Sequence, residues 1–78
     1  MRRRGAYDVD SETAIRLFLK LGVRVDGLSR REFTREYFQL ARRYHPDMTD
    51  GRTADLMASI NAARTYLEKY HRWREGNN

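Results

Sequence analysis

The sequence contains no cysteine, one proline, and no apolar segment that approaches the length of a membrane span. Without cysteine the chain can form neither a disulfide nor a thiolate metal site. A membrane-spanning helix needs about 20 consecutive apolar residues, so such a helix is also excluded. The chain has 78 residues, and a chain of this size buries only about 60 percent of its unfolded surface. We therefore expect one small domain with a thin core, and not a large self-contained enzyme.

Positive charge is what the sequence has in excess. Sixteen basic residues, most of them arginine, face eleven acidic residues and give a formal net charge of +5. This balance favours an acidic partner, which can be nucleic acid, an anionic membrane or an acidic protein surface. Arginines at positions 2–4 resemble the start of a secretory signal, but no apolar segment follows them, so a cytoplasmic location is favoured.

Residues that break helices divide the chain into three helical stretches, and no stretch is typical of a strand. We expect a flexible arm over residues 1–10, a domain over 11–75 and a polar tail over 76–78. The first helix is predicted over about residues 11–21, with Asp10 or Ser11 as its cap. Apolar side chains recur there at helical spacing, namely Ala14, Leu17, Phe18 and Leu21.

The second helix, predicted over about residues 30–44, has clear signals at both ends. Ser29 followed by Glu32 is a capping box, in which each side chain binds the other residue's backbone N–H. Pro46 disfavours helical geometry at the preceding residue, so the helix should end near Tyr44. Its apolar side chains share one face, and they are Phe33, Tyr37, Leu40, Ala41 and Tyr44.

The third helix is predicted over about residues 54–73, after a loop at 45–52. Its apolar residues follow a spacing close to that of a coiled-coil seam, namely Leu56, Ile60, Ala63, Leu67 and Tyr70. A short connection favours antiparallel neighbours, so helices two and three should form a hairpin covered by the first helix. We therefore predict an all-α fold without a fourth helix.

The tripeptide His45-Pro46-Asp47 stands in the predicted hairpin loop, directly after a basic amphipathic helix. With its flanking helices it resembles the J-domain, the module that defines DnaJ-type co-chaperones. The resemblance covers residues from about 15 to 67 and includes Ile60-Asn61-Ala62-Ala63 in the third helix. It implies the J-domain arrangement of the helical hairpin.

The resemblance also implies a function. J-domains bind the ATP-bound state of a DnaK-type (heat-shock seventy) chaperone and stimulate its ATP hydrolysis. In the family the aspartate of the loop engages an arginine of the chaperone, and this role would fall to Asp47. Pro46 would fix the loop backbone, and His45 would orient the turn and contact the partner. The module would not itself be an enzyme, and no catalytic residue, metal or cofactor is expected.

The outer face of the second helix is the second part of the predicted docking surface. Arg31, Arg35, Phe38 and Arg42 fall within roughly 60° of one another on a helical projection. In J-domains this face is basic and docks on an acidic chaperone surface, and Arg43 is expected to contribute.

This chain departs from the family on that face, because Thr34, Phe38 and Gln39 occupy positions that are often basic. Phe38 can make an apolar contact with the partner, or it can pack under a neighbouring helix or the arm. The sequence leaves both interpretations open.

Two other interpretations compete with the J-domain. His45-Pro46-Asp47 taken alone is also ordinary turn chemistry. The net charge, and the interleaved aromatic and basic residues over 70–74, are compatible with a small helical nucleic-acid-binding domain. The arginines are spread along the whole chain, however, and do not gather in one helix. We therefore favour a monomeric co-chaperone module over a nucleic-acid-binding domain.

Overall fold

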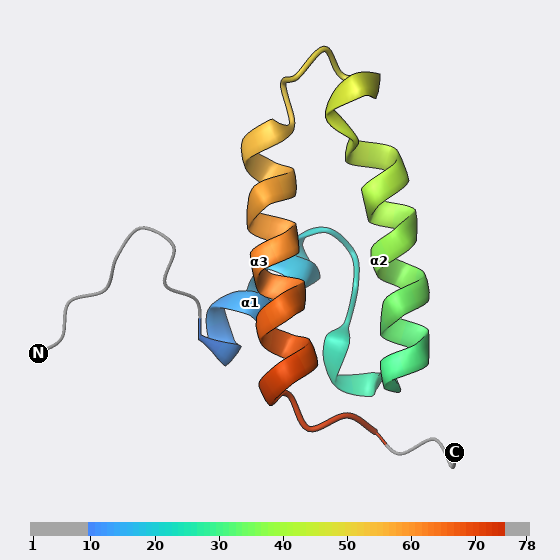
Figure 1. The fold of residues 1–78 in the computed structure, drawn as a ribbon. Coiled ribbons are helices and arrows are strands. Elements are labelled where there is room, and N and C mark those ends of the chain that lie inside the picture. Colours follow the sequence, from blue (N-terminus) through green and yellow to red (C-terminus); the bar gives the residue numbers. More distant parts are fainter. Residues whose placement is uncertain (1–9, 75–78) are drawn as a thin grey trace, which may run out of the picture.

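The computed structural model describes residues 10–74, and within them it contains three α-helices, two short 3-10 turns and no strand (Figure 1). The predicted all-α class is thereby confirmed. The elements in chain order are α1 (Ser11–Lys20), η1 (Val25–Gly27), α2 (Arg30–Tyr44), η2 (Pro46–Met48) and α3 (Ala54–Tyr70). The predicted arm (apart from Asp10) and tail lie outside the described residues. None of the described helices is long and apolar enough to cross a bilayer.

Helix α2 has the predicted bounds, and its ends have the predicted causes. The Ser29 hydroxyl accepts a hydrogen bond from the Glu32 backbone N–H at 3.1 Å, and Glu32 Oε1 accepts one from the Ser29 N–H at 2.9 Å. This reciprocal pair is the capping box. At the other end, His45 leaves the helical region, as expected for a residue before proline.

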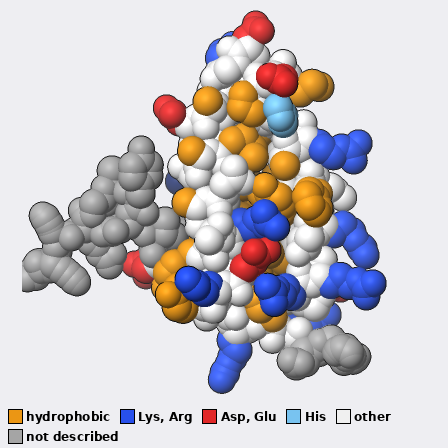
Figure 2. All heavy atoms as spheres, viewed as in Figure 1, with side chains coloured by type: hydrophobic (Ala, Val, Ile, Leu, Met, Phe, Trp, Pro, Cys, Tyr) orange, Lys and Arg blue, Asp and Glu red, His pale blue; other side chains and the backbone are white. Residues whose placement is uncertain are grey.

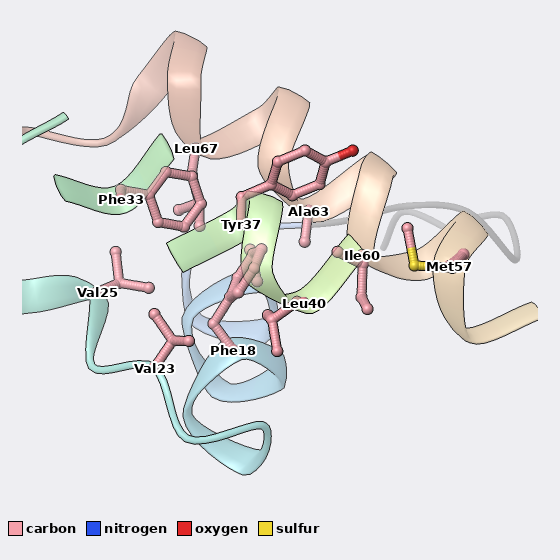
Figure 3. Close-up of a cluster of buried hydrophobic side chains, with 11 residues drawn as sticks. Phe18, Val23, Val25, Phe33, Tyr37, Leu40, Met57, Ile60, Ala63 and Leu67 are labelled. Carbon is pink, nitrogen blue, oxygen red and sulfur yellow. The ribbon is translucent and has the colours of Figure 1, made fainter. Parts of the chain in front are cut away.

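Helices α2 and α3 run antiparallel as a hairpin, and α1 lies across it and packs mainly against α3 (Figure 1). The core between them is drawn in Figure 3. Its largest fully buried side chains come from every α-helix and from η1, and they are Phe18, Val25, Phe33, Ile60 and Leu67. The rings of Phe18 and Phe33 meet edge to face at 4.9 Å, which joins α1 to the start of α2.

Helix α3 ends at Tyr70, three residues before its predicted end. His71 takes an extended conformation (ψ 143°), and the chain turns back toward the start of α2. There the indole of Trp73 packs on the Phe33 ring at 4.9 Å, and the Arg74 guanidinium lies 3.3 Å from the Glu32 carboxylate. We call residues 71–74 the strap. Contact with Phe33 buries apolar surface of Trp73, which a further turn of exposed helix would not do.

The buried face of α3 also differs from the predicted seam. Met57 is buried, whereas Leu56 is only half-buried and Tyr70 is 63% exposed. The predicted seam faces α2, with the first helix over the remaining apolar side, but α1 is the larger neighbour of α3. The position of α1 therefore decides which side of α3 faces the core. No helix follows α3 among the described residues, as predicted.

Candidate functional site

The residues His45, Pro46 and Asp47 stand at the tip of the hairpin, where the chain passes from α2 to α3 (Figure 1). The Asp47 side chain is 89% exposed and that of His45 is 54% exposed. Figure 2 shows acidic and histidine side chains together at this end of the molecule, above a row of basic side chains. The tip therefore presents a carboxylate to solvent beside a positively charged helix.

Backbone hydrogen bonds fix the shape of the tip. The Pro46 carbonyl accepts hydrogen bonds from the Thr49 N–H at 3.1 Å and the Gly51 N–H at 2.7 Å. Proline restricts the first dihedral of the turn. Asp50 and Gly51 then take positive φ values of 59° and 79°, which reverse the chain direction. These are conformations that Gly and Asp or Asn tolerate better than other residues.

Two threonines connect the tip to the ends of both helices. The Thr53 hydroxyl donates to the carbonyl of Tyr44, the last residue of α2, and lies 2.8 Å from the Thr49 hydroxyl. The Thr49 hydroxyl also accepts from the Thr53 backbone N–H at 3.3 Å. The sequence does not predict this bond across the hairpin. Such a bond joins residues nine positions apart and needs the hairpin geometry to be seen.

The His45 ring takes part in the turn itself. Its Nδ1 accepts a hydrogen bond from the Asp47 backbone N–H at 3.1 Å and lies 3.8 Å from the Asp47 carboxylate. Because Nδ1 acts as an acceptor, the neutral imidazole carries its proton on Nε2. Among the described residues Asp47 has no arginine or lysine within ion-pair distance. The carboxylate is thus available to a cation from outside the chain.

The structure brings only some of the predicted docking residues onto one face. Arg31, Arg35, Phe38 and Arg42 are all exposed on the outer side of α2. Figure 2 shows basic side chains along the α2 side of the molecule. Arg43 instead follows Arg42 by about 100° around the helix. It lines a shallow hollow with the turn after α1, so the outer face contains three arginines and Phe38.

The Phe38 ring is 55% exposed and is not part of the core. Its ring packs beside that of Tyr37, with centroids 5.3 Å apart. Tyr37 is in turn held by two residues of α3, because its hydroxyl donates to Asn61 Oδ1 at 2.7 Å and the Arg64 guanidinium lies over its ring at 4.3 Å. For the described residues, the interpretation that Phe38 packs under a neighbouring helix is therefore wrong. The sequence showed both Tyr37 and Asn61 but gave no sign of their contact.

The aromatic residues at the end of α3 do not form the stacking surface that the nucleic-acid interpretation needs. Trp73 is half-buried between Phe33 and His71, with ring centroids at 4.9 and 4.5 Å. Tyr70 alone of this group presents an exposed ring. No group of acidic, histidine or cysteine side chains among residues 10–74 could hold a metal ion. Comparison with protein-family models, curated proteins and solved structures gave no match.

Proposed function

We propose that this chain is a J-domain co-chaperone module that binds a DnaK-type chaperone and stimulates its ATP hydrolysis. The observation that carries the proposal is the exposed Asp47 carboxylate on a hydrogen-bonded tip, directly after a helix with an arginine-lined outer face. The module acts as a monomer in the cytoplasm and performs no chemistry itself, because the chaperone contains the ATPase site.

The tip is suited to recognition of a cation. An ionised carboxylate accepts hydrogen bonds at both oxygens and can bind an arginine of the partner through two parallel bonds. Because Pro46 and the bonds to its carbonyl already order the turn, little conformational entropy is lost on docking. The Nε2–H of His45 supplies a donor beside this carboxylate, so the partner is recognised by both charge and hydrogen bonding.

The arginines of α2 have a different role in the proposal. Exposed charges at the rim of an interface mainly accelerate encounter and orient the two proteins. Arg35 and Arg42 on the outer face would guide the module to an acidic region of the chaperone. Asp47 would then make the specific contact that couples docking to hydrolysis.

Single-turnover ATP hydrolysis by a DnaK-type chaperone, with and without the module, tests this proposal. The parent should accelerate hydrolysis, and Asp47→Asn should not at matched concentration. Removing one member of a buried charge pair costs about 2–5 kcal/mol, so Asp47→Asn should need at least ~30-fold more protein for equal stimulation. Loss of the Nε2–H geometry in His45→Gln should reduce stimulation as well.

Asp50→Asn is the matched control, because it removes the same charge three residues away and leaves the tripeptide intact. Its stimulation and its circular dichroism should equal those of the parent. A parent that does not accelerate hydrolysis, or an Asp47→Asn variant that stimulates as well as the parent, would contradict the proposal. Tight binding of random duplex DNA with a steep salt dependence would instead support the nucleic-acid interpretation.

A further inference from the structure

Phe38 is the outermost member of a group of side chains that contact one another across α2 and α3. Its ring lies against Tyr37, which is 8% exposed and is held from α3 by Asn61 and Arg64. Single exposed apolar residues are ordinary on protein surfaces. Contact with Tyr37, however, restricts the Phe38 ring, and such restriction lowers the entropy lost when a partner covers the ring. This support makes Phe38 a suitable anchor for a binding partner.

The arginines around Phe38 have no acidic partner within the described part of the chain. Arg35 and Arg42 lie about one turn before and after Phe38 on the same face of α2, and neither forms an ion pair among residues 10–74. By contrast, Arg16, Arg64 and Arg74 are each paired with a glutamate. Unpaired arginines around an apolar ring favour a partner surface that is acidic at its edge and apolar at its centre.

We infer that Phe38 is the apolar anchor of the docking surface, and that it enters an apolar depression edged by carboxylates on the chaperone. This inference rests on the proposed function, because the chaperone is the partner. It adds a contact that the arginines alone would not supply. Burial of apolar surface is insensitive to moderate salt, whereas exposed ion pairs are screened. Docking should therefore persist at salt concentrations that abolish a purely electrostatic contact.

Direct binding of the 78-residue chain to an ATP-loaded, hydrolysis-deficient DnaK-type chaperone, measured at several salt concentrations, tests the inference. Phe38→Ala should weaken binding about 10- to 30-fold at every salt concentration, because apolar burial is lost while the charges stay. Phe38→Lys should also weaken binding, and should make its dependence on salt steeper. Both variants should melt within a few degrees of the parent, since the ring is not in the core.

Leu19→Ala is the matched control, because Leu19 is 54% exposed on α1 and Phe38 is 55% exposed on α2. Its binding should equal that of the parent. Three results would overturn the inference. The first is an unchanged affinity of Phe38→Ala for the chaperone, and the second is a fall of many degrees in the melting temperature of Phe38→Lys. The third is a Phe38→Lys variant that loses binding to duplex DNA but keeps its binding to the chaperone. The second result would mean that another part of the chain covers the ring.

The outcomes separate this inference from the proposed function. If the parent binds and stimulates, and Asp47→Asn loses stimulation, but Phe38→Ala binds like the parent, only the role of Phe38 is wrong. If the parent neither binds nor stimulates the chaperone, both proposals fail together. Weaker binding by Phe38→Ala, with stimulation restored at high concentration, supports both.

Discussion

The two ends of the helical hairpin are held by different kinds of interaction. At the tip, residues 45–53 contain no buried side chain, and hydrogen bonds of the Pro46 carbonyl and of two threonine hydroxyls set the shape. At the base, the aromatic rings of Phe18, Phe33 and Trp73 pack in succession. Apolar burial therefore stabilises the base, while the tip keeps its polar side chains available to a partner.

This difference predicts that stability and partner binding can be changed separately. Substitutions at the base should alter the free energy of unfolding and affect binding only through the folded fraction. Substitutions of the exposed tip side chains His45 and Asp47 should alter binding and leave the melting temperature nearly unchanged. An Asp47 variant that unfolds the protein, or a variant truncated at a buried ring of the base that keeps the stability of the parent, would break the comparison.

The largest effect is expected from Phe33→Ala at the base. Phe33 is fully buried between Phe18 and Trp73, and truncation of a buried phenylalanine costs about 3–5 kcal/mol. This is a large part of the stability of so small a domain, so much of the protein should unfold at room temperature. Circular dichroism with thermal melting measures this, and Phe38→Ala on the same helix is the control. Equal melting temperatures for the two variants would show that the base is not the stabilising end.

A smaller effect is expected from Thr53→Val at the tip. Valine keeps the shape of threonine but removes the hydroxyl that donates to the Tyr44 carbonyl. The loss of this bond should cost about 1 kcal/mol, measured by denaturant unfolding. Thr65→Val, at an exposed position of α3, serves as the control. If Thr53→Val stimulates the chaperone normally, the threonine bonds are not needed to position Asp47.

The smallest effect concerns pH and Glu32. The hydrogen bond from the Ser29 backbone N–H is the main cause that lowers the pKa of Glu32 below the ordinary value of 4.5. Burial opposes this shift, and the charge of Arg74 adds to the lowering. A carboxylate with a lowered folded pKa adds stability above its unfolded pKa, and this stability is lost as the pH falls through the folded pKa. Unfolding measured from pH 7 to pH 3 should show a smaller decrease for Glu32→Gln than for the parent. An identical decrease would mean that the strap and the capping box do not bind the ionised form.

The sequence predicts those features of the fold that neighbouring residues determine. The bounds of α2 follow from Ser29, Glu32 and Pro46, because a capping box and a proline act within a few residues of each helix end. The exposure of His45 and Asp47 follows in the same way from their place in a hairpin loop. The role of these residues in chaperone stimulation stays a prediction.

Features that depend on distant residues were not predictable in this way. The sequence predicts that α3 ends at about Trp73. Trp73 in fact leaves the helix to pack on Phe33, which is 40 positions earlier in the chain. The contact of Tyr37 with Asn61 likewise needs the spacing between α2 and α3. The distance between α2 and α3 cannot be obtained from a single sequence.

The position of Trp73 also determines the wavelength at which the protein fluoresces. It is the single tryptophan of the chain, and its indole nitrogen is buried without a hydrogen-bond partner among the described residues. An indole shielded from water fluoresces at shorter wavelength than a hydrated one. Tryptophan fluorescence is therefore an optical probe of the base, and it should shift when the strap detaches and stay constant while the tip engages a partner.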